Sequence, residues 1–296
     1  MSYDLMFSTS PGQELETPAL SSYFQGKRNY KVEKSQAWYE NEDTGVYFGF
    51  DLGPEQPDED EEDPFPSVAS FNLNYFRPHI FGLEAEPEVA AFIETFKLGV
   101  HDPQVAGMED DPYSREGFLR GWNKGNEVAY SAIIGQNGLT SVRHSLPGTV
   151  IERCWRWNYG RNSLQSLLGD SIFVPKILFM LYKQRLCTAL VWPDAIPVAL
   201  PPADLYLVCR QAYAPRRLFA PKKEDVVVVE SGTVEPLISP YRLGEGELPY
   251  RLLDYRTPPG ELTAWIRCLT AGEAKPEIVA VDSILNSEIV ATCSES

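Results

Sequence analysis

Hydrophobic and polar residues alternate in short segments of the first hundred residues, which is the period-two pattern of half-buried β-strands. The clearest case is residues 29–52, where two alternating runs flank the turn-forming sequence NEDTG. In the second run Val46, Phe48 and Phe50 share one face. This pattern predicts a β-hairpin. Further strands are predicted in SYDLMFS at the start of the chain and in SVASFNLNYF at 67–76.

A different spacing predicts two helices in the same region. TPALSSYFQG has Thr17 as a candidate cap, Pro18 at the first helical position and Gly26 at the end. In residues 84–99, Val89, Phe92, Ile93 and Phe96 form one apolar stripe, and Pro87 is expected near the helix start. The order β-α-β-β-β-α predicts an antiparallel sheet covered by helices on one face, an α+β sandwich of ferredoxin-like type.

The second half of the chain contains a run of β-rich segments, and the three residues KQR between the first two suit a tight hairpin. Prolines at 193, 197, 201 and 202 are expected at sheet edges or bulges. The predicted helical segment is LQSLLGDSIF. The predicted strands are KILFMLY, CTALVW, IPVAL, DLYLVCR, DVVVVESG and EIVAVDSIL.

Together these patterns predict an α+β fold of two domains, each a mainly antiparallel sheet with helices packed on one face. An acidic domain is expected over 1–125 and a β-rich domain over 150–296. Residues 126–149 are expected to connect them and to contain a short helix in NEVAYSAIIG. A chain of 296 residues is long enough for two hydrophobic cores.

The distribution of charge separates the two halves. Residues 1–142 hold 9 Lys and Arg against 25 Asp and Glu, a difference of −16. Residues 143–296 hold 17 against 17, a difference of zero. The net charge of −16 argues against nucleic acid or an anionic membrane as a direct partner.

The five cysteines are widely spaced, with no C-x-x-C pair, and the chain opens without a basic and apolar leader. No run approaches the length of a membrane span. These features predict a cytoplasmic protein with reduced thiols and no membrane association. No sequence motif points to a cofactor or a metal ion.

Two acidic clusters are the first candidate partner-binding residues. They are Asp58, Glu59, Asp60, Glu61, Glu62 and Asp63, with Glu109, Asp110 and Asp111. One interpretation is a solvated loop between strands, which costs little loop entropy. The other is an electrostatic surface that speeds encounter with a basic partner.

A second candidate is the aromatic and arginine-rich sequence CWRWNYGRN at 154–162. Trp155, Arg156 and Trp157 are of the residue types enriched at protein interfaces. In an extended segment these residues would alternate between two faces. The alternative is that Trp155 and Trp157 fill a core while the arginines face water.

No catalytic motif stands out. His79, His101 and His144 lack zinc-ligand spacing, and no G-x-S-x-G sequence supplies a nucleophile for His101 or His144. The glycines of GWNKGNEVAYSAIIGQNG lack the strand–loop–helix context of a phosphate site. We therefore expect no catalytic residues, while a hydrolase site assembled from remote segments remains an alternative.

The segments SYDLMFS and YKVEKSQAWYENEDTGVYFGFDL resemble uncharacterised bacterial proteins encoded near secreted antibacterial toxins. The resemblance covers about a third of the chain and is structural, since it rests on a hairpin. It implies a cytoplasmic, non-enzymatic bacterial immunity protein that binds one cognate toxin tightly. The strongly acidic first half of the chain suits a basic, nuclease-like toxin, and we expect the inhibitor to block it by occlusion. A scaffold of a secretion assembly is the remaining alternative.

Overall fold

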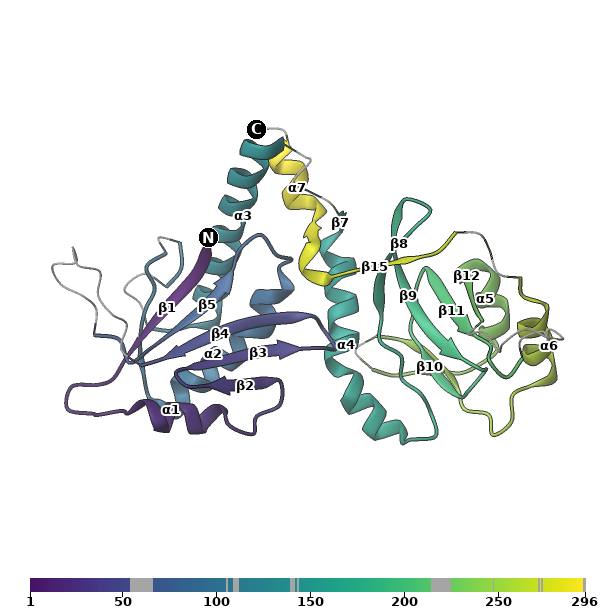
Figure 1. Ribbon diagram of the computed structural model, residues 1–296, viewed down its shortest axis with the longest axis horizontal. Coiled ribbons are helices and arrows are strands. Elements are labelled where there is room, and N and C mark those ends of the chain that lie inside the picture. The colour runs from purple at the N-terminus through teal and green to yellow at the C-terminus, as the bar shows by residue number, and fades with distance from the viewer. Residues whose placement is uncertain are drawn as a thin grey trace. The chain divides into compact units, whose positions relative to one another are not determined.

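The computed structural model has the predicted α+β fold, with helices and several mostly antiparallel sheets (Figure 1). It describes residues 1–53, 66–104, 106–108, 112–138, 142, 144–213, 225–246, 248–270, 272 and 274–294. The chain divides into two compact units. Unit 1 comprises residues 1–151 and 281–296, and unit 2 comprises residues 152–280.

Unit 1 is built on a six-stranded sheet in the order β2-β3-β4-β5-β1-β6, and every neighbouring pair is antiparallel. The strands are β1 (Ser2–Ser8), β2 (Tyr30–Glu33), β3 (Gln36–Asn41), β4 (Val46–Leu52), β5 (Ala69–Asn74) and β6 (Gly99–His101).

The alternation read from the sequence sets which face of this sheet is buried. In β4, Val46, Phe48 and Phe50 are buried while the residues between them are not, which confirms the predicted hairpin. The run that precedes the turn is two strands, because Lys34 adopts a left-handed conformation (φ 50°) between β2 and β3. A meander of three strands therefore stands where the sequence predicted two.

Three helices cover one face of the sheet: α1 (Thr17–Phe24), α2 (Ile80–Phe96) and α3 (Arg115–Asn137). Their aromatic side chains meet those of the strands around Phe92. The centroid of the Phe92 ring lies 5.3 Å from those of Phe7 and Phe24 and 5.2 Å from that of Phe50. Such edge-to-face and offset contacts add to the burial of large apolar surface.

Close packing of α2 and α3 on the sheet depends on glycines. A Cβ at Gly82 of α2 would lie 2.1 Å from Cδ1 of the fully buried Trp122 of α3. A Cβ added at Gly121 of α3 would likewise lie 2.8 Å from Tyr3 Oη, so the side chain of Tyr3 packs directly on this glycine. The glycines of GWNKGN therefore serve helix packing and do not mark a connecting loop.

The last residues of the chain return to unit 1. They form a 3₁₀ turn (Val281–Ser283), β16 (Ile284–Asn286) and α7 (Ser287–Ser294), and β16 pairs in parallel with β7 (His144–Leu146). Helix α7 packs on α3 through a cluster that includes Tyr130, Leu285 and Val290. The side chain of Asn286 also accepts a hydrogen bond from the backbone N–H of His79 (3.0 Å).

Unit 2 contains a five-stranded sheet in the order β12-β11-β9-β8-β15, antiparallel except for the β9–β11 pair, and a three-stranded sheet in the order β10-β14-β13. Its strands are β8 (Leu178–Tyr182), β9 (Arg185–Pro193), β10 (Val198–Leu200), β11 (Leu205–Cys209), β12 (Val226–Glu230), β13 (Leu243–Gly244), β14 (Tyr250–Leu253) and β15 (Glu277–Val279). Its helices are α4 (Gly148–Leu168), which starts in unit 1, α5 (Ser231–Ile238) and α6 (Gly260–Cys268).

The hairpin predicted at KQR is confirmed. Tyr182 pairs with Arg185, and the two residues between them, Lys183 and Gln184, have positive φ values of 50° and 64°. Two consecutive left-handed residues are typical of the tight turn that matches the twist of the flanking strands.

Several sequence predictions need correction. Helix α3 crosses residue 125 and runs through the first half of 126–149, and the whole segment belongs to unit 1, so it is not a connection. Residues 281–296, expected in the domain 150–296, belong to unit 1 because β16 and α7 pack there. The ferredoxin-like arrangement is wrong, since β1 lies between antiparallel partners β5 and β6. Pro87 lies inside α2, which begins at Ile80.

We predict opposite effects for two glycine-to-alanine substitutions in these helices. Gly82→Ala forces a Cβ into the Trp122 ring and should lower the free energy of unfolding by about 1–3 kcal/mol. Gly135→Ala in α3 meets no atom within 4 Å and should raise it by up to about 1 kcal/mol through helix propensity. Urea unfolding measures both, and an equal gain in stability for the two variants would contradict this packing.

Candidate functional site

The second face of the unit 1 sheet is the candidate site, because the three helices pack on the other face. Helix α2 reaches the second face at Tyr47, whose ring packs edge-on against Phe81 with the centroids 5.4 Å apart. Figure 1 shows α2 and α3 behind the sheet. We call the side chains of β1–β5 that point away from the helices the open face, and none of them is buried. The open face consists of Ser2, Asp4, Met6, Ser8, Lys31, Glu33, Gln36, Trp38, Glu40, Tyr47, Gly49, Asp51, Ser70, Asn72 and Asn74.

A large exposed aromatic residue lies on the open face. Trp38 of β3 is 42% exposed and pairs across the strands with Gly49 of β4. A Cβ at Gly49 would lie 3.4 Å from the indole Cε3, so the ring rests directly over the glycine backbone. The ring of Tyr47 is nearly parallel to the indole, with the centroids 5.7 Å apart and an interplanar angle of 24°. The two rings form one amphipathic surface of the kind found at interface hot spots.

Polar side chains surround these rings in cross-strand pairs. Gln36 donates a hydrogen bond to Asp51 (2.7 Å), and Lys31 forms an ion pair with Glu40 (3.2 Å). Asn72 donates to Asp4. The strand residues of the open face include four carboxylates and one ammonium group, that of Lys31. The carboxylates are those of Asp4, Glu33, Glu40 and Asp51. The face is therefore negatively charged and partly pre-ordered by its own hydrogen bonds.

The difference in net charge is larger between the two structural units than between the two halves of the sequence. Unit 1 holds 10 Lys and Arg against 28 Asp and Glu, a difference of −18, whereas unit 2 holds 16 against 14, a difference of +2. The acidic excess of the chain thus belongs to the unit that carries the open face. Such a field favours approach of a basic partner.

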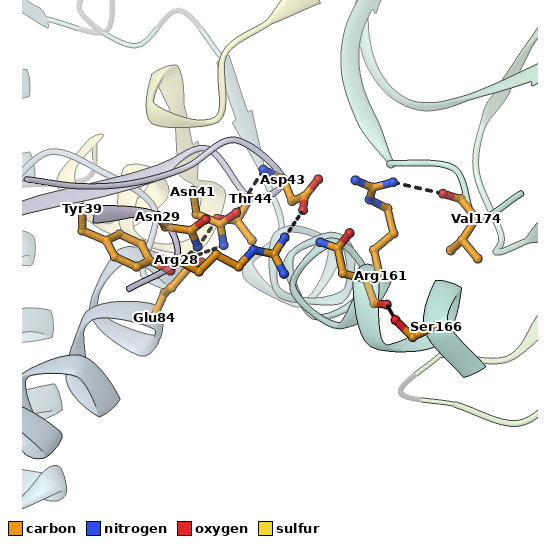
Figure 2. A network of polar contacts seen from close by, with 11 residues as sticks. Arg28, Asn29, Tyr39, Asn41, Asp43, Thr44, Glu84, Arg161, Ser166 and Val174 are labelled. Atoms are coloured by element: carbon orange, nitrogen blue, oxygen red, sulfur yellow. Dashed lines mark hydrogen bonds and ion pairs between the residues drawn. The ribbon is translucent and has the colours of Figure 1, made fainter. Parts of the chain in front are cut away.

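A buried carboxylate supports the hairpin that carries Trp38 (Figure 2). Glu84 of α2 is 1% exposed, and its Oε1 accepts hydrogen bonds from the side chains of Tyr39 (2.8 Å), Asn41 (2.7 Å) and Thr44 (3.0 Å). These three donors lie on the helix side of β3 and in the turn that follows it. Charge-assisted bonds of this kind are stronger than neutral ones and hold the hairpin against α2.

Burial and the charge of Glu84 raise the pKa of Tyr39 above its ordinary value. The hydroxyl group therefore stays protonated and continues to donate to Glu84 at alkaline pH. Tyr39 also stacks on Phe48, with ring centroids 4.4 Å apart. The inward face of the hairpin is rigid for both reasons, and the outward side chains are displayed on a fixed frame.

The structure describes only some of the partner-binding residues that the sequence predicts. Asp58, Glu59, Asp60, Glu61, Glu62, Asp63, Glu109, Asp110 and Asp111 lie outside the described residues. Their role stays a prediction.

The aromatic candidates at 154–162 lie in α4, so the extended segment expected there is wrong. Helical spacing explains the difference, because Ile151, Cys154, Trp157 and Asn158 are buried at intervals of three or four residues. Trp157 belongs to the core and donates its indole N–H to the Pro175 carbonyl (2.8 Å).

Trp155 and Arg156 remain accessible on α4. Trp155 is half-buried against Tyr159, with ring centroids 5.6 Å apart, and Arg156 pairs with Glu152 (2.7 Å). Of the two tryptophans expected in the core, only Trp157 is there. Which ring of a short aromatic segment is buried depends on whether the segment is helical or extended, and the sequence alone does not show this.

The histidines named as hydrolase candidates lie in different sheets. His101 is exposed on β6 of the six-stranded sheet, and His144 is half-buried in β7 of the two-stranded sheet. Within the part of the chain that the structure describes, no group of three or more His, Cys, Asp or Glu residues is placed to hold a metal ion. Over the same residues, no helix combines the length and the apolar character needed to cross a bilayer.

The sequence itself contains a signal for the open face. The alternation in residues 36–52 places Trp38 on the polar side of the hairpin, with Gln36 and Glu40 as its neighbours. Trp is enriched among the residues that anchor protein interfaces, so a Trp at a polar-face position marks a candidate contact surface. Its position opposite Gly49 follows once the register is known.

Comparison of the chain with models of known protein families, with curated proteins and with solved structures found no match.

We predict that Trp38 contributes little to stability. Trp38→Ala uncovers Gly49 and should lower the free energy of unfolding by about 0.2–1 kcal/mol, the range of one cross-strand pair. Trp38→Phe keeps a ring over the glycine and should lose less. Urea unfolding of both variants provides the measurement. A loss above about 3 kcal/mol for Trp38→Ala, typical of a core aromatic, would place Trp38 in the core.

We predict that Tyr39 makes the protein sensitive to alkali. Its pKa is raised in the folded chain, so its contribution to stability is complete below about pH 10. Above that pH the unfolded chain releases the proton first, and the free energy of unfolding falls by about 1.4 kcal/mol per pH unit for this group. Tyr39→Phe should be less stable at neutral pH, because Glu84 loses a donor, and should show a shallower alkaline slope.

The matched control for this comparison is Tyr159→Phe, which alters a half-exposed tyrosine on α4. Unfolding is followed in urea from about pH 8 to about pH 11. Equal alkaline slopes for wild type and Tyr39→Phe would show that Tyr39 does not contribute to the loss of stability in alkali. Other buried tyrosines with raised pKa values, such as Tyr3 and Tyr30, account for the slope that remains in Tyr39→Phe.

Proposed function

We propose that the chain is an immunity-type inhibitor that binds one basic bacterial toxin and neutralises it by occlusion, without catalysis of its own. The observation that carries the proposal is the open face, an uncovered and negatively charged sheet surface with Trp38 exposed on it. The toxin is the partner implied by the resemblance of the N-terminal hairpin sequence. The cytoplasm of the producing cell is the compartment in which such an inhibitor acts.

The open face supplies part of the area that this role needs. Its five strands, spaced about 4.8 Å apart, span about 19 Å, and the longer strands of six or seven residues are about 20–23 Å long. A flat surface of these dimensions is about 400 Å², roughly half of the 800 Å² that one partner contributes to a specific complex, so surface beside the sheet must also take part. Tight occlusion of an enzyme needs such an area together with a few aromatic anchors.

The charge of unit 1 supports a basic partner. Long-range attraction steers the encounter and raises the association rate, while short-range contacts of the aromatic anchors slow dissociation. The steering component is screened within about 8–10 Å at physiological salt. Association should therefore slow steeply as salt is added, and an association rate independent of salt would contradict the proposal.

The test is affinity capture of the tagged full-length chain from a lysate of its source bacterium, at low and at moderate salt. We expect one basic partner in stoichiometric amount. The captured protein is then expressed in an indicator strain, where we expect it to arrest growth. Co-expression of the wild-type chain should restore growth, and Trp38→Ala should restore it less well.

Trp155→Ala is the matched control, because it truncates a half-buried tryptophan on α4 outside the open face. It should protect the indicator strain as well as wild type does. A captured protein that is harmless, or a toxin that the chain fails to neutralise, would contradict the proposal. Retention of substrate-like small molecules would instead favour the hydrolase, and self-association into rings or filaments would favour the scaffold.

A further inference from the structure

We infer that Trp38 and the carboxylates beside it form a receptor for an arginine side chain presented by the partner protein. This inference rests on the proposed function and specifies the chemistry that the open face recognises.

The position of the indole is the first argument. With 42% of Trp38 exposed and its ring resting over Gly49, the indole has a supported side and an accessible side. The neighbouring Tyr47 is fixed as well, since its hydroxyl donates to Asp282 (2.9 Å) and accepts from Arg77 Nε (3.1 Å). A rigid, half-exposed indole is the best aromatic surface for a cation in proteins.

The charges around the ring are the second argument. By strand register Lys31 lies opposite Trp38, and its ammonium group is paired with Glu40. Glu33 and Asp51 occupy the diagonal positions on the strands at either side. Lys31 and Glu40 offset each other. Glu33 and Asp51, which form no ion pair with any residue that the structure describes, therefore add two negative charges beside the indole.

The geometry favours a guanidinium group over other cations. A planar guanidinium stacks on an indole face while its N–H donors point outward in the plane, toward acceptors at the ring edges. Glu33 and Asp51 lie on opposite sides of β3 and supply such acceptors. A lysine ammonium group approaches the ring as a single point charge and cannot reach both sides in this way.

The experiment titrates the full-length, tryptophan-labelled protein with a short peptide that contains two arginines, acetyl-Gly-Arg-Gly-Arg-Gly-amide. Two-dimensional NMR follows the indole N–H signals, and Trp38→Phe identifies the signal of Trp38. We expect a saturable shift of the Trp38 signal, a weaker effect of the lysine peptide, and no effect of the citrulline peptide, a neutral isostere of the arginine one. Equal shifts with the arginine and citrulline peptides would overturn the inference.

Matched charge variants separate local recognition from general attraction. Glu33→Gln with Asp51→Asn should weaken binding of the arginine peptide about tenfold, a loss of about 1.4 kcal/mol. Glu14→Gln with Glu94→Gln removes the same charge from exposed positions outside the open face and should leave affinity within about twofold. An equal loss in both double variants would overturn the inference.

The outcomes also separate this inference from the proposed function. If the toxin is captured and neutralised but Trp38 does not respond to the arginine peptide, the arginine receptor is refuted and the inhibitor role stands. If Trp38 responds and no toxin is captured, the receptor stands and the inhibitor role is refuted.

Discussion

The aromatic core around Phe92 is the constraint on which the architecture of unit 1 depends. Phe7, Phe24 and Phe50 contact Phe92 from three different elements, so α1, α2 and the sheet share one centre. Helix α3 joins the same side of the sheet through Phe118, whose ring packs on those of Tyr3 and Phe71. Because all three helices are held on one face, the opposite face is left for solvent or for a partner.

The open face gains its specific character from the residues that hold it in place. Glu84 fixes the hairpin from the helix side, and Gly49 provides space on the other side for the indole of Trp38. Negative charge is concentrated in unit 1 and not in unit 2. A rigid aromatic centre within an acidic surface is a combination suited to rapid association with a basic protein and slow dissociation from it.

Local patterns in the sequence predicted the strands and the turns well. The alternation in 46–52 and the tight hairpin at KQR depend only on neighbouring residues, and both are confirmed. The extent of α3 was missed because Gly121 and Gly125 suggest a loop until their packing against Tyr3 and Tyr75 is known. The return of the C-terminal residues to unit 1 depends on long-range pairing of β16 with β7, which no local pattern contains.

The candidate site was predictable only in part, because its position depends on which face of the sheet the helices pack against.

The most direct test of the account is hydroxyl-radical footprinting of the chain alone and in complex with its captured partner. Oxidation of Trp38 and of Met6, both on the open face, should fall in the complex, while that of Trp155 and Tyr159 on α4 should not change. Protection of Trp155 and Tyr159 with Trp38 left reactive would contradict the account and move the partner surface to α4.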